Sequence, residues 1–170
     1  MRADGSKKRK RLSCIARRLV QAGWLVCLVG VLTLVACQKG LYHAEYHDLT
    51  SSGWDSRDTL VFELPATAHD QALGLTVSVR STSRFGYCEV ATQVEVLCDG
   101  QVTAVMPISV PMCEAAGHPL GGGVMMRTHM SEPEPLHLKA GHHYTLRLTH
   151  RMRLNPLEEV LAVGVVLENR

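Results

Sequence analysis

The 170-residue sequence lacks the short signatures of the common enzyme classes. It contains no G-x-S-x-G turn, P-loop, G-x-G-x-x-G loop, H-E-x-x-H motif or paired C-x-x-C spacing, so neither catalysis nor nucleotide binding of those types is indicated. Internal repeats, low-complexity tracts and a shift in composition marking a second domain are also lacking. Only 5% of the residues are aromatic, but 46% are hydrophobic and 20% charged. This composition excludes a collagen, a disordered tail and a polytopic membrane protein.

An excess of basic residues is also missing once the chain is divided at residue 36. Of the 18 Lys and Arg residues, eight lie in residues 1–36, where Asp4 is the only acidic residue. The remainder holds 10 basic and 15 acidic residues, a net charge of −5. The sequence pI of about 8.3 therefore reflects the N-terminal segment, and we expect no nucleic-acid partner.

The N-terminal segment has the pattern of a secretory signal. A basic stretch, Lys7–Arg18, precedes the apolar run Leu19–Val35, as in the charged and hydrophobic regions of a signal peptide. We predict a signal helix within residues 1–36. An uncleaved membrane anchor is the alternative, because the 17 residues of the run approach the roughly 20 that cross a hydrocarbon core.

Cys37 follows the apolar run directly and decides between these two interpretations. Leu34, Val35 and Ala36 place small residues before a cysteine, which is typical of a bacterial lipobox. We therefore predict that Cys37 carries a covalent lipid, with no other cofactor, and that residues 37–45 form a tether. Several acyl chains hold a protein stably on a membrane, each buried CH₂ contributing about 0.8 kcal/mol.

The tether indicates which membrane is involved. Gln38 stands where an Asp would commonly mark retention in the inner membrane, and Gln38–Leu41 carries no acidic cluster of the kind that directs some lipoproteins to the cell surface. We expect the periplasmic leaflet of the outer membrane, with surface exposure as the alternative.

Cysteine usage favours a domain without disulfide support. Cys14 and Cys27 belong to the leader, which leaves Cys88, Cys98 and Cys113 in an oxidising compartment. If residues 88–98 form one strand, its ends lie roughly 33 Å apart, far beyond the roughly 4.4–6.8 Å that a disulfide requires. Cys88 and Cys98 should therefore not pair. A bond from either to Cys113 stays open, but we favour three small buried hydrophobes.

Hydrophobic residues after the leader repeat with period two, as in half-buried β-strands. Asp99-Gly100 between two such runs predicts a tight hairpin, with Gln101–Met106 returning. Pro107–Pro135 is interpreted as irregular, with a short strand at Val124–His129. The alternating or continuous apolar runs that predict the other strands are Leu60–Leu64, Leu73–Val79, Val90–Cys98, Tyr144–Leu148 and Val160–Leu167.

No stretch after the leader has helical spacing. Seven or eight short strands in about 130 residues predict an all-β fold, a single antiparallel β-sandwich of jelly-roll or immunoglobulin-like type over residues 46–170. A domain of this size buries one core without a metal or a disulfide.

Four residues are candidates for an interaction surface. Trp54, the only tryptophan after the leader, either stacks on a sugar or partner together with Tyr46, or caps one end of the core. Arg151 and Arg153 place two cations at a strand end, where they face an acidic partner or lipid headgroups, or merely protect a solvated edge.

The sequence offers only weak candidates for metal-binding and catalytic residues. His142 and His143 suggest a metal, but neighbours on a strand point to opposite faces and cannot share one ion without a bulge, so we predict no metal. Cys113 and His118 have no spacing specific to a nucleophile and its base. A hydrolase would need a pocket that joins at least two of four residues, His118, Glu114, Asp55 and Asp58.

Read in order, these segments resemble the gliding-motility lipoprotein H (GldH) family of the Bacteroidetes. The resemblance covers nearly the whole chain after the leader and lies in the order of weak motifs. Gly86 stands where the family typically has Pro, and His118-Pro119 lies near the family's Trp. The matching pieces are the lipobox ending at Cys37, Tyr46–Leu49, Gly53-Trp54, Asp58, Val61–Glu63, Leu75–Arg80, Phe85–Tyr87, the long strand with Asp99-Gly100, Cys113–Gly123, Gly141–Arg153 and Leu157–Leu167.

The resemblance implies an outer-membrane lipoprotein associated with gliding motility and the envelope machinery linked to type IX secretion, without catalysis. We expect it to act as an interaction or assembly module whose partners are the membrane, through its lipid, and other envelope or motility lipoproteins and membrane proteins. A glycan-binding lipoprotein of the same architecture is the alternative. The departures from the family motifs affect partner contacts more than the fold.

Overall fold

The computed structural model describes residues 40–121 and 125–170, which form nine β-strands and no helix. No helix able to cross a lipid bilayer occurs in these residues. The strands are β1 (Leu41–Asp48), β2 (Leu60–Glu63), β3 (Gln71–Thr82), β4 (Glu89–Cys98), β5 (Gln101–Pro111), β6 (Met126–Met130), β7 (Glu134–Leu138), β8 (Tyr144–His150) and β9 (Val160–Asn169).

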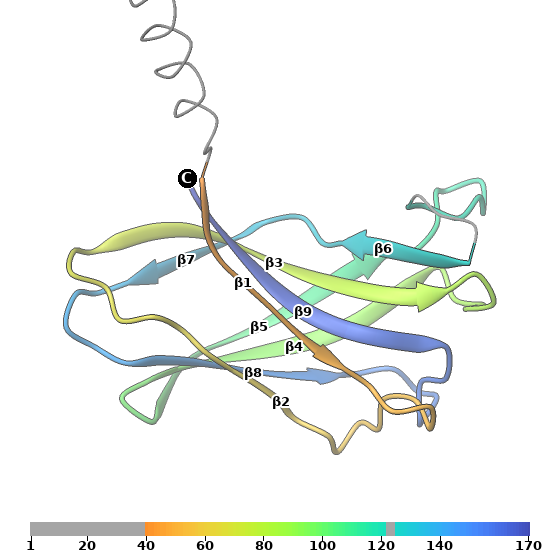
Figure 1. Cartoon of the computed structure of the whole chain (residues 1–170), viewed down its shortest axis with the longest axis horizontal. Coiled ribbons are helices and arrows are strands. Elements are labelled where there is room, and N and C mark those ends of the chain that lie inside the picture. The colour runs from red at the N-terminus through yellow and green to blue at the C-terminus, as the bar shows by residue number, and fades with distance from the viewer. Residues whose placement is uncertain (1–39, 122–124) are drawn as a thin grey trace, which may run out of the picture. The chain divides into compact units, whose positions relative to one another are not determined.

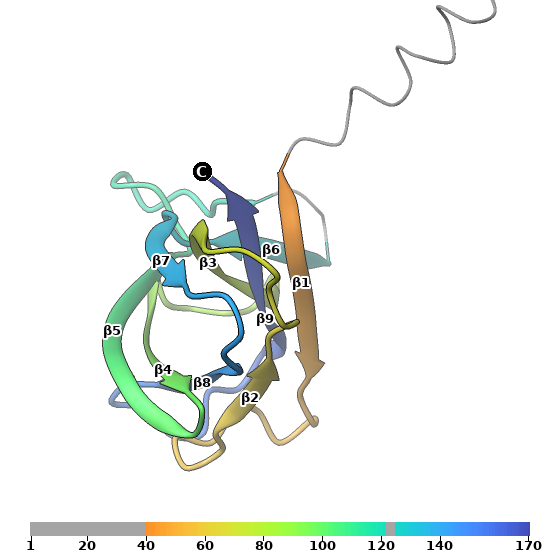
Figure 2. The same ribbon diagram turned by 90° about the vertical axis from the view of Figure 1, so that its left-hand side faces the viewer.

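The strands form two antiparallel sheets packed face to face (Figures 1 and 2). One sheet has the order β1-β9-β3-β6, with β7 also pairing along β3, and the other has the order β2-β8-β4-β5. Figure 2 shows the two layers on either side of the core. The predicted all-β sandwich is confirmed.

The core lies between the sheets and is built from the alternating residues that predicted the strands. Leu73, Leu75, Val77 and Val79 of β3 are at most 1% exposed. Because successive side chains of a strand point to opposite faces, period two in the sequence places one whole set in the core. Partners from the facing sheet and from β9 complete it, among them Phe62, Val90, Val94, Leu146, Leu148, Val163, Val165 and Leu167.

The hairpin between β4 and β5 has the predicted turn. Asp99 and Gly100 have φ angles of 49° and 81°, the left-handed conformation that a two-residue hairpin turn requires and that glycine adopts without steric cost. The returning strand, however, continues to Pro111 instead of ending near Met106. Strand β5 lies at the edge of its sheet, where a proline without an N–H group does not break a ladder of hydrogen bonds.

Two further strands correct the prediction for the proline-rich region. Strand β6 covers part of the short strand that we expected, and β7 contains Pro135 in a region interpreted as irregular. Both strands pair with the edge of β3 that does not face β9. Each therefore has one edge without a neighbouring strand among the described residues. Proline therefore interrupted the period-two pattern without preventing strand formation.

The folded unit begins earlier than expected. Gly40–Arg170 forms one compact unit, and β1 pairs along β9 from Leu41, inside the predicted 37–45 tether. No residue of β1 is fully buried, so its sequence carries no clear alternation. The predicted signal helix over residues 1–36 and the lipid-bearing Cys37 lie outside the described residues.

Candidate functional site

Trp54 belongs to the core and offers no stacking surface. Its side chain is 0% exposed, its Nε1 donates a hydrogen bond of 3.1 Å to the carbonyl oxygen of Asp58, and its ring packs edge-on against His150 at 5.1 Å between centroids. The backbone of Trp54 pairs with Leu157 through two hydrogen bonds of 3.0 and 2.8 Å. Of the two interpretations of Trp54, the core cap is confirmed, and its place in an interaction surface is wrong.

Tyr46 is held on the outer face of the sheet. A Cβ atom on Gly164 of β9 would lie 2.5 Å from the Tyr46 ring, so only glycine leaves room for it there. The Tyr46 hydroxyl donates a 3.2 Å hydrogen bond to Oγ of Ser78, and the guanidinium of Arg80 lies 4.5 Å from the ring centroid. The contacts with Gly164 and Arg80 leave little of the ring free for a sugar.

Arg151 and Arg153 follow β8 on the protein surface. Arg151 donates two hydrogen bonds of 2.9 and 2.7 Å to Oε1 of Gln93, which orients its side chain. Arg153 is exposed, and both arginines border a shallow hollow with Tyr87, Met152 and Leu154. The prediction of two neighbouring cations at a strand end therefore holds, and Tyr87 is an aromatic neighbour that the strand pattern did not single out.

A disulfide joins Cys88 to Cys113, which corrects the expectation of three unpaired cysteines. The predicted lack of a Cys88–Cys98 bond is confirmed, since Cys98 is free. Cys88 and Cys113 flank the open end of the β4–β5 hairpin, where the carbonyl of Cys88 accepts a 2.9 Å hydrogen bond from the Met112 amide. Counting outward from the Asp99-Gly100 turn places residue 88 opposite residues 111–113, so the hairpin register contained this signal.

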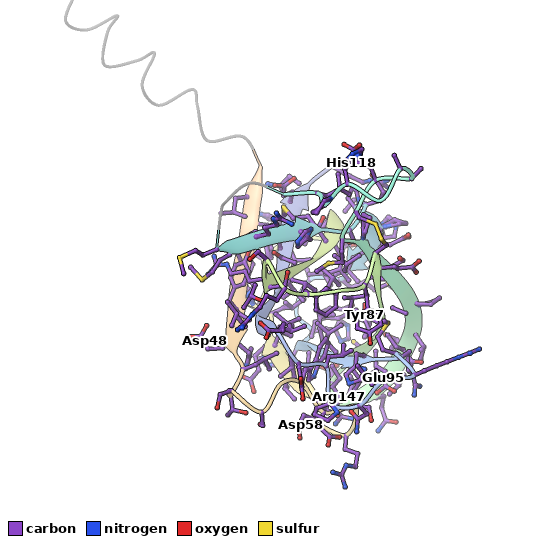
Figure 3. The ribbon with its side chains drawn as sticks, turned by 90° about the vertical axis from the view of Figure 1, so that its right-hand side faces the viewer. Asp48, Asp58, Tyr87, Glu95, His118 and Arg147 are labelled. Atoms are coloured by element: carbon purple, nitrogen blue, oxygen red, sulfur yellow. A yellow bond between two sulfur atoms is a disulfide. The ribbon has the colours of Figure 1, made fainter. Side chains whose placement is uncertain are left out.

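The disulfide forms one wall of a pocket of about 220 Å³. Two segments quoted above for the family resemblance, Phe85–Tyr87 and Cys113–Gly123, both contribute to it. In Figure 3, Tyr87 lies between His118 at the top of the view and Asp58 at the bottom. The lining residues are Ser81, Thr82, Phe85, Gly86, Tyr87, Cys88, Met112, Cys113, Gly117, Pro119, Arg127 and His129.

Tyr87 connects this pocket with the hollow beside Arg151 and Arg153, since it lines both. Tyr87 is 43% exposed and packs edge-on against Phe85 at 5.5 Å between centroids. Three arginines and no Asp or Glu occur among the residues that line the two depressions. We call this combined surface the Tyr87 surface. It presents an aromatic ring and cations together, which suits a partner with both apolar and acidic groups.

His129 forms part of the pocket floor, and a second histidine, His150, lies in the core. They are 4% and 1% exposed, and neither Nδ1 of His129 nor Nε2 of His150 has a hydrogen-bond partner among the described residues. Burial lowers the pKa of both groups, and the nearby Arg127 lowers that of His129 further. Both side chains are therefore neutral in the folded protein at neutral pH.

This burial predicts a loss of stability in mild acid. Below the ordinary histidine pKa of 6.5, the unfolded chain binds protons that the folded chain does not, so the free energy of unfolding falls as the pH drops toward the lowered folded pKa values. We expect about 1.4 kcal/mol per pH unit for each histidine in that window, measured by urea unfolding between about pH 7 and pH 5. His129→Gln and His150→Gln should each flatten this pH dependence.

The four residues considered for hydrolysis form two local pairs, each joined by a backbone hydrogen bond: Glu114 with His118 at 2.7 Å, and Asp58 with Asp55 at 2.9 Å. Cys113 is bonded to Cys88 and offers no thiolate. Asp55 is paired with Arg57 at 2.9 Å, and hydrogen bonds from Arg57 hold the pKa of that carboxyl well below its usual range. Figure 3 shows His118 and Asp58 at opposite sides of the molecule. Among the described residues, no hydrogen bond joins the side chains of any two of these four.

A family model for the GldH lipoprotein matches residues 41–167, which is almost all of the folded unit. The chain belongs to the GldH lipoprotein family. It is therefore a lipoprotein related to gliding motility, and lipoproteins are anchored to a membrane. No curated protein matches the chain.

Several solved structures are distantly similar to the chain. A family 35 carbohydrate binding module from Clostridium thermocellum is 13% identical, with a TM-score of 0.36 over 74% of this chain and 90% of that one. Dimeric latent PorU from Porphyromonas gingivalis is also 13% identical, with a TM-score of 0.33 over 77% of this chain and 13% of that one. A CocE/NonD family hydrolase from Staphylococcus aureus is 9% identical, with a TM-score of 0.33 over 77% and 32%. At these scores, no function follows from the similarity.

Proposed function

We propose that this GldH-family lipoprotein is a non-catalytic interaction module of the outer membrane. In this proposal, a lipid on Cys37 holds the sandwich at the periplasmic face, and the Tyr87 surface binds an acidic partner in the envelope machinery. The single observation that carries the proposal is the convergence of the Phe85–Tyr87 and Cys113–Gly123 segments on one pocket beside the exposed Tyr87.

Charge supports the choice of an acidic partner. The chain after residue 36 has a net charge of −5, yet the residues that line the Tyr87 surface include Arg127, Arg151 and Arg153 and no carboxylate. A cationic area attracts a partner surface of complementary, acidic charge. Arg151 is already oriented by Gln93, which reduces the entropy lost when it meets a partner.

Attachment to the membrane explains how a small binding surface is enough to hold a partner. Confinement to a membrane raises the effective concentration of a partner in the same membrane without adding contacts. Only residues 38 and 39 separate Cys37 from the first described residue, Gly40. A lipid on Cys37 would confine the folded unit, and with it the Tyr87 surface, to the membrane that carries such partners.

The test is capture of partners by the tagged, acylated full-length protein from its own envelope. We expect Tyr87→Ala combined with Arg153→Glu to reduce capture of the partner about 10-fold or more, because aromatic and arginine side chains dominate binding energies. High salt should weaken capture by the wild type. Arg170→Glu, the same charge reversal at the exposed C-terminus, is the matched control and should capture normally.

Two results would contradict the proposal. Undiminished capture by the Tyr87→Ala, Arg153→Glu variant would remove the surface from consideration, and normal capture by Cys37→Ala expressed without a lipid would remove the role of the tether. Urea unfolding of each variant checks that the fold is intact.

Glycan binding is the second candidate function. The exposed ring of Tyr87 beside a pocket supports it, because an exposed aromatic ring can stack on a sugar. Trp54 no longer contributes to this alternative, because it is buried. A neutral envelope glycan would be captured with little dependence on salt and on Arg153, whereas an acidic protein would depend on both.

A further inference from the structure

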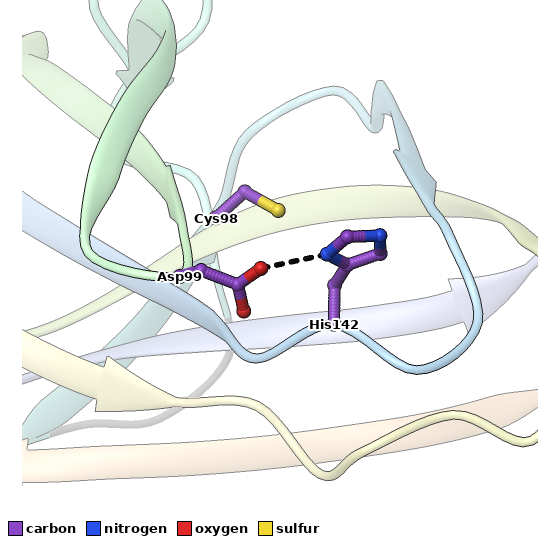
Figure 4. A group of neighbouring side chains, drawn as sticks. All are labelled: Cys98, Asp99 and His142. Atoms are coloured by element: carbon purple, nitrogen blue, oxygen red, sulfur yellow. Dashed lines mark hydrogen bonds and ion pairs between the residues drawn. The ribbon is translucent and has the colours of Figure 1, made fainter.

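A second cluster lies at the opposite end of β4 from the disulfide. Cys98 ends β4, Asp99 begins the hairpin turn, and His142 comes from the loop between β7 and β8 (Figure 4). One ligand atom of each, the thiol Sγ, a carboxylate oxygen and an imidazole nitrogen, lies within 4.8 Å of the other two. We propose that Cys98, Asp99 and His142 bind a divalent transition-metal ion, with zinc as the best fit. This site is independent of the Tyr87 surface.

The donor set determines the type of metal. Thiolate, imidazole and carboxylate are the ligands that zinc uses, at about 2.3 Å for sulfur and about 2.0–2.2 Å for nitrogen and oxygen. Ca²⁺ and Mg²⁺ prefer oxygen ligands alone, so one thiol and one imidazole disfavour them. Three protein ligands leave the fourth tetrahedral position to water or to a small ligand.

The geometry needs only small movements to accept an ion. Nδ1 of His142 lies 2.7 Å from Oδ2 of Asp99, and a tetrahedral ion would separate this pair to about 3.3 Å. Small rotations of these two side chains supply the extra distance, since His142 and Asp99 are 45% and 52% exposed and free to move. The same exposure gives an ion a path to the site from solvent.

The backbone holds the two loops together before any ion binds. The Asp99 amide donates a 2.8 Å hydrogen bond to the carbonyl of His143, and the His143 amide donates one of 2.9 Å to Oδ1 of Asp99. Oδ1 is thereby oriented, and Oδ2 faces the imidazole. Outer hydrogen bonds of this kind fix a ligating carboxylate and raise metal affinity.

Charge balance is favourable for a dication. The Asp99 carboxylate has a lowered pKa because it accepts hydrogen bonds from His142 and His143, so it is ionised at neutral pH. On binding, Cys98 releases its thiol proton to solvent, and the proton that His142 shares with Asp99 leaves Nδ1, so that the tautomer with its proton on Nε2 binds the metal through Nδ1. Lys139 and His137 line the neighbouring groove and are the groups that oppose a cation there.

This assignment differs from the one that the sequence suggested. His142 and His143 are adjacent, and the expectation that they do not ligate together is consistent with the structure, where only His142 belongs to the cluster. The partners of His142 come from a turn more than forty residues away in the sequence. Only the antiparallel pairing of β8 with β4 brings them close.

The test uses the full-length protein in detergent, with Co²⁺ and then Zn²⁺ as the probes. Cobalt bound to a thiolate gives a sulfur-to-metal charge-transfer band in the near ultraviolet. We expect one Co²⁺ per chain with this band, displaced stoichiometrically by Zn²⁺. Cys98→Ser should abolish the band, and His142→Gln should weaken Zn²⁺ binding at least about 10-fold in competition with a chromophoric chelator.

Controls separate this site from other thiols and histidines. His143→Gln keeps the backbone hydrogen bonds and should bind Zn²⁺ normally, as should His118→Gln at the far loop. A charge-transfer band that persists in Cys98→Ser, or Zn²⁺ affinity unchanged in His142→Gln, would overturn the proposal. Unfolding curves of the metal-free variants show whether a loss of binding reflects a loss of fold.

Discussion

Replacing Trp54 by alanine will lower the free energy of unfolding by about 3–5 kcal/mol, the cost of truncating a large buried aromatic side chain. Trp54 is 0% exposed, contacts His150 and donates its indole hydrogen bond to Asp58. Alanine would leave a cavity and an unpaired carbonyl at this end of the core. Urea unfolding of the wild type and Trp54→Ala measures the difference.

Tyr87→Ala is the matched control for this prediction. Its ring is 43% exposed, so we expect its loss to cost less than about 1 kcal/mol. A Trp54→Ala variant as stable as the wild type would show that the tryptophan is not a core residue, and stacking on a ligand would again explain it. The free energy of unfolding of Trp54→Phe should lie between those of the wild type and Trp54→Ala, because phenylalanine retains part of the ring volume.

Removing the disulfide by Cys88→Ala with Cys113→Ala will cost about 3–4 kcal/mol. The bond closes a loop with a sequence separation of 25 residues, and chain entropy for such a loop gives about 3.5 kcal/mol at 25 °C. The loss should appear as a lower urea midpoint with a somewhat steeper slope, because the unfolded chain without the crosslink is less compact and exposes more surface. Cys98→Ala, which removes a half-buried free thiol, is the control and should be close to neutral.

The disulfide prediction also concerns function. Cys113 begins the loop that closes the pocket beside Tyr87, so the double variant should lose partner capture even at temperatures where the sandwich remains folded. A double variant as stable as the wild type would indicate that the two cysteines are reduced in the native protein. Thiol titration of the unfolded wild-type chain distinguishes the two states.

Local sequence patterns were sufficient for the central strands. In β3 and β4 the apolar side chains alternate cleanly, because each strand has one face on the core. Asp99-Gly100 specified the hairpin because few other residue pairs adopt the turn that it needs. The continuous apolar run of β9 was also visible, since consecutive residues of this strand are buried on both of its faces.

Three edge strands, β1, β5 and β7, were missed or cut short in the sequence analysis. No residue of β1 is fully buried, and β5 and β7 carry prolines that interrupt the pattern. At an edge, one side of the strand has no ladder to complete, so alternation and N–H groups are both less constrained. The strand pattern consequently ended the returning strand too early and began the folded unit too late.

The sequence by itself determined the lipobox pattern, the family resemblance, the all-β class and the register of one hairpin, because each depends on residues close together in the chain. The tertiary structure alone decided that Trp54 lies in the core, that Cys88 meets Cys113, that Tyr87 joins Arg151 and Arg153, and that His142 reaches Cys98. These contacts depend on which strands become neighbours and on which side chains the facing sheet covers. Both are set by packing of the whole sandwich, and period-two alternation within one strand carries no information about either.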